Sequence, residues 1–269
     1  MEVITSNQNP RIKHAISLKH KRTRDLEKLL TLEGRDELAL ALDSGLRPLR
    51  VFWCPSLAHG EDAPLLKRCV QLAQEVLEIS PGLMEKIAFR NNPDGWFCIA
   101  HQPETRLEDL GKILDASHSP ALLLLAEDLE KPGNFGALIR TAEAVGAHGF
   151  ISVDGRTDLW NPNSVRASKG AVLTFPVVQS SLEQVISWLK GRSINIIAAD
   201  PEGENLYWDL DLSGPLALVI GSEDQGLTQG MKSQADCLVQ LPMEGKINSL
   251  NASLTGGLLL YEAKRQRRR

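Results

Sequence analysis

The stretch Ala121-Leu122-Leu123-Leu124-Leu125-Ala126 is continuously apolar, which is the pattern of a strand buried on both faces of a parallel sheet. Further strands are predicted at 149–153, 216–220 and 237–241, with helix patterns between them. Helices are expected over 134–145 and, at the end of the chain, over 251–265. This alternation predicts an α/β domain whose parallel sheet has helices on both faces.

A smaller α/β domain is predicted before this sheet, following a basic helix at 11–22. Its strands are expected at 29–33, 50–54, 75–79 and 96–100, and its helices at 35–44, 63–74 and 81–88. The stretch 101–120 is polar and contains two prolines, so we interpret it as a connection that includes a short helix at 107–114. We therefore assign 1–105 to an N-terminal domain, 106–120 to a linker and 121–269 to the second domain.

The composition is that of an ordinary globular protein, with 42% hydrophobic and 24% charged residues in 269. No apolar run approaches the roughly 18 residues that span a bilayer, and no signal peptide opens the sequence, so we expect a cytoplasmic protein. Cys54, Cys69, Cys98 and Cys237 form no C-x-x-C pair, and the six histidines form no cluster. We predict reduced thiols and no metal.

The positive charge is concentrated at two places, although the net charge is −4. The segment 11–24 carries six basic residues and 264–269 carries five, both without an acid, and the remainder has 19 basic against 34 acidic residues. Such concentration favours contact with a polyanion, because neutralised phosphates release counterions. We predict RNA contacts at Lys19, Lys21, Arg22 and Arg24; the alternative is a solvated helix face and a frayed tail.

Ligands of parallel sheets bind in the loops after the strands, and the loop after Ala126 is unusual. It contains Pro132-Gly133-Asn134, where Asn134 can cap the following helix. Arg140 follows within the first turns of that helix, a place from which a guanidinium can grip a phosphate. The alternative is an arginine paired with Glu143 or Glu127.

Two further loops carry polar residues. The sequence Gly221-Ser-Glu223-Asp-Gln-Gly226-Leu is neither a P-loop nor a dinucleotide fingerprint, which argues against a dehydrogenase. After the strand at 237–241, the cluster Ser249-Leu250-Asn251-Ala-Ser253 opens the last helix. Ser249 can cap that helix, but three polar residues exceed what capping requires.

The ordered motifs N-x-G-x-x-x-R-T-A, G-S-E-x-x-G-L and L-P-M…S-L-N-A-S…Y-E-A resemble those of the SpoU/TrmH family of SPOUT methyltransferases over about residues 121–265. The segment 161–171 is similar to the family's stretch between the first two motifs. The start of the chain, with Asn7 to Lys13 and then Glu33-Gly34, resembles members that carry an extra N-terminal RNA-binding domain.

The resemblance implies a SPOUT catalytic domain with a deep C-terminal trefoil knot, preceded by a small α/β RNA-binding domain. It implies S-adenosylmethionine as cofactor, held by Gly221, Leu241 and Leu250. Asn134, Arg140, Glu223, Ser249 and Asn251 match catalytic and substrate-binding positions. The family's homodimers complete each active site across the subunit interface, and the apolar helix at 251–265, with Gly256-Gly257 inside it, suits such an interface alongside the helix at 134–145; the alternative is a helix buried within its own subunit.

The activity that this resemblance implies is methylation of a ribose 2′-hydroxyl in structured RNA, with ribosomal RNA favoured. The alternatives are a transfer RNA 2′-O-methyltransferase and a catalytically silent RNA-binding protein. Because arginine keeps its proton in proteins, we expect Arg140 to bind the adjacent phosphate and orient the hydroxyl, not to act as a base.

Overall fold

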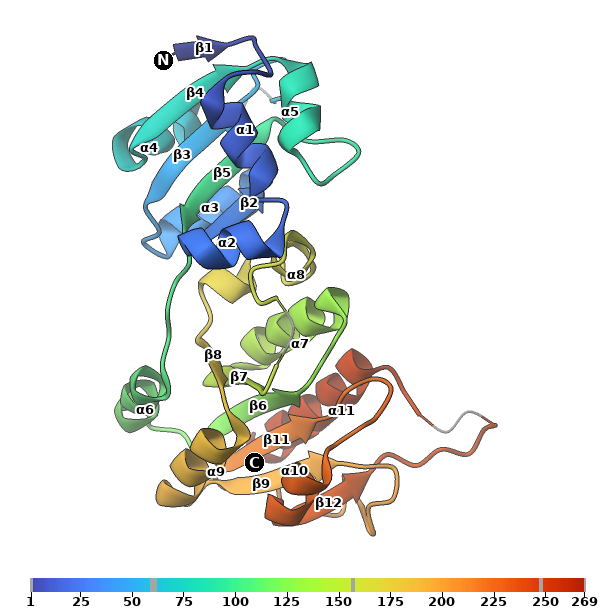
Figure 1. Cartoon of the computed structure of the whole chain (residues 1–269). Helices are drawn as coiled ribbons and strands as arrows, with labels where there is room; N and C mark the ends of the chain where they lie inside the picture. Colours follow the sequence, from blue (N-terminus) through green and yellow to red (C-terminus); the bar gives the residue numbers. More distant parts are fainter. Residues whose placement is uncertain (1, 59–61, 156–157, 247–248, 269) are drawn as a thin grey trace. The chain divides into compact units, whose positions relative to one another are not determined.

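The computed structural model describes residues 2–58, 62–155, 158–246 and 249–268 (Figure 1). The contacts divide the chain into two compact units. Unit 1 consists of Met1–Pro103 and Asp158–Thr174, and unit 2 of Glu104–Thr157 and Phe175–Arg269. A segment from the second half of the chain, Asp158–Thr174, therefore belongs by its contacts to unit 1.

Unit 1 contains a mixed five-stranded sheet in the order β1-β4-β3-β5-β2. β5 runs antiparallel to β3 and to β2, and the remaining pairings are parallel. Its elements are β1 Glu2–Ile4, α1 Pro10–Ser17, α2 Lys21–Glu27, β2 Leu29–Glu33, α3 Arg35–Asp43, β3 Pro48–Trp53, α4 Ala63–Leu72, β4 Glu75–Ile79, α5 Pro81–Ile87, β5 Trp96–His101, α8 Pro162–Ala167 and η1 Ala171–Leu173.

Two features of unit 1 differ from the predictions. The expected basic helix at 11–22 is two helices, α1 and α2, because the chain turns at Leu18, whose side chain is fully buried in the core. The strand β1 was not predicted, since three residues are too few for a visible alternation, and only its pairing with β4 defines it.

Unit 2 contains a seven-stranded sheet in the order β10-β12-β9-β11-β6-β7-β8, and all of its strand pairs are parallel, as the sequence predicts. Its elements are α6 Leu107–Ala116, β6 Leu122–Glu127, α7 Pro132–Val145, β7 Gly149–Val153, β8 Val177–Ser180, α9 Leu182–Gly191, β9 Asn195–Ala199, β10 Asn205–Leu206, β11 Leu216–Ile220, α10 Gln229–Gln234, β12 Cys237–Gln240 and α11 Ala252–Gln266.

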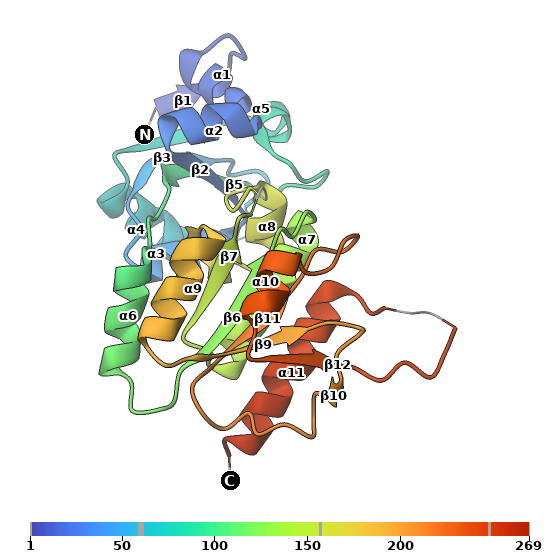
Figure 2. The ribbon, with the colours of Figure 1, turned by 60° about the horizontal axis from the view of Figure 1, so that its bottom comes forward.

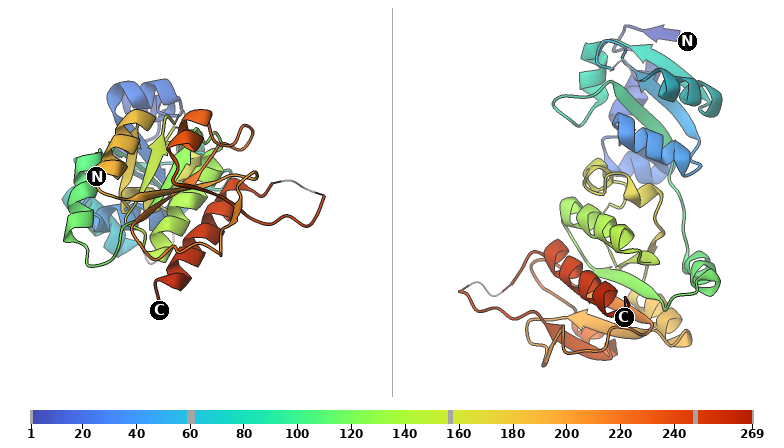
Figure 3. Two further views of the ribbon diagram at one scale, coloured as in Figure 1. Left: turned by 90° about the horizontal axis from the view of Figure 1, so that it is seen from below. Right: turned by 180° about the vertical axis from the view of Figure 1, so that it is seen from behind.

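Helices cover both faces of this sheet, and alternate leucines of β6 serve the two faces. Leu123 and Leu125 pack in one cluster with Leu110 of α6 and with Val185 and Leu189 of α9. On the other face α7 and α11 lie side by side (Figures 2 and 3). Burial of both faces accounts for the continuously apolar run of β6.

The helices α7 and α11 approach closely because α11 has a glycine at the contact. A Cβ on Gly256 would lie 2.4 Å from a methyl carbon of Leu138 on α7. Thr141 lies beside Gly257, 3.7 Å from where its Cβ would be. Gly256 therefore serves packing within the chain, whereas the sequence suggested a role of both glycines between two chains; at Gly257 a Cβ would make an ordinary contact.

The trefoil knot stays a prediction, because Ile247 and Asn248 lie outside the described residues. No helix in the described ranges is long and apolar enough to cross a membrane. Among the same residues, no group of three or more His, Cys, Asp and Glu side chains could hold a metal ion.

Candidate active site

Three loops that the sequence singled out leave the same edge of the sheet in unit 2. β6 and β11 are neighbours in register, with Ala126 beside Ile220, so the loops after them start side by side. β12 lies one strand further along, separated from β11 by β9. Because every strand is parallel, all three loops emerge at the carboxyl edge, where such sheets bind ligands.

Asn134 connects the other two loops to the start of α7. The helix begins at Pro132, a residue suited to the first helical position, so Asn134 lies inside the first turn. The prediction that Asn134 caps this helix is therefore wrong. Its amide nitrogen donates to Glu223 Oε1 at 2.7 Å. Its Oδ1 accepts from the Asn251 amide at 3.0 Å. A continuous hydrogen-bonded chain, Asn251–Asn134–Glu223, thus joins the three loops.

Glu223 accepts three hydrogen bonds from the loop after β6. Besides Asn134, the backbone N–H groups of Glu130 and Lys131 donate to its carboxylate at 3.2 and 3.4 Å. Burial opposes ionisation, but the bonds from Asn134 and the backbone N–H groups outweigh it and lower the pKa of Glu223. A carboxylate with a lowered pKa is a weak base, so the geometry suits a role in holding the loops.

The loop after β11 is folded tightly on itself. Ser222 and Gly226 exchange two backbone hydrogen bonds, of 3.0 and 3.1 Å. A Cβ on Gly221 would lie 2.3 Å from the carbonyl carbon of Gly226, so only glycine fits at this position. Sequence reasoning missed the residues that fix the end of this loop: Thr228 donates two hydrogen bonds to Glu127, the last residue of β6.

Asn251 is the N-cap of α11, the role that the sequence suggested for Ser249. Its Oδ1 accepts from the backbone N–H groups of Ser253 and Leu254, at 2.9 and 3.4 Å. Ser249 and Leu250 precede it and are exposed. Neither Leu241 nor Leu250 has a backbone hydrogen-bond partner among the described residues.

Arg140 is exposed on α7. Within the described ranges it forms no ion pair with Glu127 or Glu143, the partners of the alternative interpretation. It follows Asn134 by six positions, which places it about 120° around the helix from that residue. Arg140 and Asn134 therefore lie on different faces of α7.

The basic segment of unit 1 uses several of its cations internally. Arg24 is buried, donates to the carbonyls of Leu18 and Lys19 at 2.6 and 3.0 Å, and pairs with Asp158. The structure thus contradicts the expected RNA contact for Arg24. Lys19 is half-buried and donates to the Ala88 carbonyl at 2.7 Å. Lys21 and Arg22 are exposed, as an RNA contact requires.

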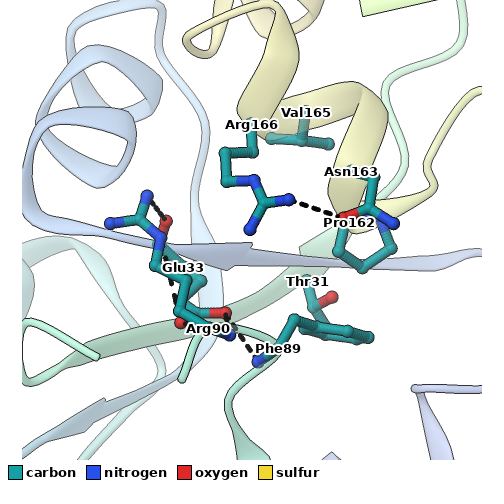
Figure 4. Close-up of a pocket in the computed structure, with 8 residues that line it drawn as sticks. All are labelled: Thr31, Glu33, Phe89, Arg90, Pro162, Asn163, Val165 and Arg166. Atoms are coloured by element: carbon teal, nitrogen blue, oxygen red, sulfur yellow. Dashed lines mark hydrogen bonds and ion pairs between the residues drawn. The ribbon is translucent and has the colours of Figure 1, made fainter. Parts of the chain in front are cut away.

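The segment Asp158–Thr174 also contacts β2 of unit 1, as Figure 4 shows. Arg166 donates to Asn163 Oδ1 at 3.0 Å, and across from them Glu33 accepts from the backbone N–H groups of Phe89 and Arg90. The space between these residues is about 10 Å³, room for a single water molecule. This hollow is too small for a larger ligand.

Comparison with known proteins identifies both parts of the chain. The model of the SpoU rRNA Methylase family matches residues 121–261, and that of the MRM3-like substrate binding domain matches residues 9–98. The 23S rRNA (uridine(2479)-2′-O)-methyltransferase of Streptomyces viridochromogenes is 31% identical over 256 residues, which are 93% of this chain and 86% of that protein.

Two solved structures are similar along nearly the whole chain. A crystal structure of an RNA 2′-O ribose methyltransferase has a TM-score of 0.82 and 34% identity, and covers 98% of this chain and 99% of its own. The AdoMet-bound rRNA methyltransferase from Sinorhizobium meliloti has a TM-score of 0.87 and 28% identity, with coverage of 98% and 97%.

Proposed function

The chain belongs to the SpoU rRNA methylase family, and we propose that it transfers a methyl group from S-adenosylmethionine to a ribose 2′-hydroxyl of ribosomal RNA. The observation that carries this proposal is the chain Asn251–Asn134–Glu223, which joins the three motif loops at one edge of the sheet. The similarity to an AdoMet-bound rRNA methyltransferase supports the choice of cofactor. The substrate-binding domain match over residues 9–98 supports RNA binding by unit 1.

The residues at the sheet edge fit S-adenosylmethionine, which when bound supplies a methyl group on a sulfonium cation. We assign the holding of this cofactor to Gly221, Leu241 and Leu250. The backbone groups of Leu241 and Leu250 have no backbone partner among the described residues, and the Leu250 side chain is 38% exposed. Glu223 adds a carboxylate whose lowered pKa keeps it negative, which suits a cationic ligand.

The ribose hydroxyl is a poor nucleophile, so its orientation is the main contribution of the protein. We assign to Arg140 the phosphate next to the reacting ribose, because its exposed guanidinium keeps its charge and presents several donors. Asn134, Ser249 and Asn251 complete the hydrogen bonds around the hydroxyl. Glu223 holds Asn134 in place.

We further propose a homodimer whose active sites lie across the subunit interface. On α11 the residues Leu254, Leu258 and Tyr261 form an exposed apolar stripe, 51%, 37% and 56% exposed, which one chain leaves uncovered. Arg140 lies about 120° around α7 from Asn134, and we infer that a second chain brings its arginine to the three loops. A two-fold axis supplies that arrangement symmetrically.

Light scattering tests the dimer. The parent should have twice the mass of one chain at micromolar concentration, and the double variant Leu254→Glu/Leu258→Glu should be monomeric and inactive. Leu26→Glu is the matched control, because Leu26 is an equally apolar residue of unit 1, 81% exposed, and outside α11. A monomeric parent contradicts the dimer.

The methylation itself is tested with labelled cofactor on ribosomal and transfer RNA, followed by mapping of the 2′-O-methyl sites. We expect one ribose of ribosomal RNA to be labelled. Labelling of transfer RNA alone would contradict the substrate class. Binding of RNA without any methyl transfer, by a protein that also binds no S-adenosylmethionine, would identify a silent RNA-binding protein.

A further inference from the structure

Backbone contacts hold the loop from Gly221 to Thr228 at its start and in its interior, but not at its end. It starts at Ile220, which is paired with Ala126 of β6. Inside it, Ser222 and Gly226 exchange two backbone hydrogen bonds, and the backbone at Gly221 is in contact with that of Gly226. Besides the hydrogen bonds that Glu223 accepts, the conformation of the loop therefore depends on what holds Thr228.

A buried carboxylate holds Thr228. Glu127 is 1% exposed, and its Oε1 accepts from the Thr228 hydroxyl at 2.6 Å while its Oε2 accepts from the Thr228 backbone N–H at 2.8 Å. A buried charge is costly unless hydrogen bonds compensate it. Thr228 also caps α10 by accepting from the Met231 N–H at 3.1 Å, a task that requires no carboxylate. Glu127 is thus an addition to an already sufficient cap.

Two carboxylates, Glu127 and Glu223, link the two neighbouring loops by hydrogen bonds. Glu127 precedes the loop after β6 and holds the end of the loop after β11. Glu223, on the loop after β11, holds Glu130, Lys131 and Asn134 of the loop after β6. The loop after β11 is therefore held by the last residue of β6, and the loop after β6 is held by Glu223 of the loop after β11.

We propose that Glu127 is a positioning residue of the methyl transfer: acting through Thr228, it fixes the loop Gly221–Leu227 in the conformation that binds S-adenosylmethionine. This inference rests on the proposed function, which places Gly221 at the cofactor. A loop held in its binding conformation loses less freedom when the ligand arrives, so the contact raises cofactor affinity. RNA affinity, most of which we assign to unit 1, is unaffected.

Calorimetric titration of the full-length protein with S-adenosylmethionine tests the inference. Thr228→Val removes the hydroxyl and should raise the cofactor Kd about tenfold, the effect of one hydrogen bond to a charged group. Thr228→Ser keeps the hydroxyl and should bind within about twofold of the parent. The Kd for RNA should be the same in all three proteins.

Ser181→Ala is the matched control, because Ser181 caps α9 through the Gln184 N–H and forms no hydrogen bond with either loop among the described residues. It loses a cap as Thr228→Val does, yet should keep the parent's cofactor affinity. Should Thr228→Val fail to fold, Glu127→Gln is the second variant. Glutamine keeps the shape of the side chain but has a single acceptor oxygen, so the cofactor Kd should rise by less than in Thr228→Val.

The results separate the inference from its premise. A parent that binds no S-adenosylmethionine overturns the proposed function and the inference with it. A parent that binds, together with a Thr228→Val that binds equally well, overturns only the inference. Equal weakening in Ser181→Ala and Thr228→Val, or no rescue by Thr228→Ser, would show that the contact serves general stability and overturns it as well.

Discussion

Arg24 of unit 1 and Arg140 of unit 2 carry the same guanidinium, and the sequence predicted an RNA contact for each. The Arg24 side chain is 2% exposed and is occupied by two carbonyls and by Asp158. Arg140 is exposed and has no ion pair with the neighbouring acids Glu127 and Glu143 among the described residues. The difference shows that a cation can serve a ligand only where the chain's own acceptors have not already occupied it.

The C-terminal tail repeats the pattern of Arg24. Arg267 donates to the carbonyls of Pro120, Ala121, Leu212 and Gly214, at distances from 2.5 to 3.2 Å. Burial lowers the pKa of this guanidinium. Arg267 therefore anchors the end of α11 beside the start of β6, and the tail up to residue 268 is not simply a frayed basic segment; Arg269 lies outside the described residues.

The largest expected effect is on turnover, from Arg140→Ala. If this guanidinium orients the ribose through its phosphate, turnover should fall about a thousandfold, as when a transition-state donor is lost. The Kd for S-adenosylmethionine should stay within about twofold of the parent, since the role we assign to Arg140 is a contact with the RNA phosphate and not with the cofactor. Single-turnover methyl transfer and calorimetry measure the two quantities.

Arg140→Lys is the control for charge. Lysine keeps the positive charge but lacks the planar fork, so it should restore little of the rate if two donors on one phosphate are required. Near-normal turnover in Arg140→Ala would contradict the assignment and remove the contrast with Arg24.

Arg24→Ala should act on stability instead. Removal of the guanidinium leaves Asp158, 9% exposed, without its cationic partner, and breaking a buried pair costs about 3–5 kcal/mol of unfolding free energy. Denaturation in urea measures this loss, and Arg22→Ala, which removes an exposed cation two residues earlier, should unfold like the parent. An unfolding free energy of Arg24→Ala equal to that of the parent would show that the pair with Asp158 does not stabilise the fold.

Most of the fold could be predicted, because local patterns dominate it. The bounds of β2, β4, β7 and β11 agree with the predicted ranges to the residue, since each is a short apolar or alternating run between turn signals. The assignment of Asp158–Thr174 to unit 1 could not be predicted. It depends on contacts between residues more than a hundred positions apart, such as Arg24 and Asp158, and no local pattern reports them.

The candidate site could be predicted as a set of residues but not as a network. The motifs identified Asn134, Glu223 and Asn251, which the structure joins by hydrogen bonds. The contact of Glu127 with Thr228 was missed, because a glutamate at the end of an apolar strand looks like the start of a solvated loop. Whether a polar side chain meets solvent or another loop is decided by the packing of distant segments.

A smaller effect is expected from the exposed cations of α2. The double variant Lys21→Gln/Arg22→Gln should weaken RNA binding and reduce the slope of log K against log salt by about 1 to 2, since each phosphate that the variant no longer neutralises lowers the slope by about one. Arg106→Gln/Lys112→Gln removes the same charge from exposed positions of unit 2 and should leave the slope unchanged. Equal slopes in both double variants would identify α2 as a solvated surface.

The smallest expected effect concerns His148, which, like Arg24, makes its contacts within its own chain. Its Nδ1 accepts from the Leu122 N–H at 3.1 Å, at the start of β6, and burial lowers its pKa. The folded state therefore prefers the neutral ring, while the unfolded chain takes up a proton at about pH 6.5. This contribution to stability is complete above that pH and is lost as the pH falls towards the folded-state pKa. The urea midpoint of the parent should decline between about pH 6.5 and 5 more steeply than that of His148→Asn, whose side-chain oxygen can accept the same bond without titrating. The exposed His118→Asn should follow the parent, and parallel curves for the parent and His148→Asn would show that the imidazole keeps the same affinity for protons in both states.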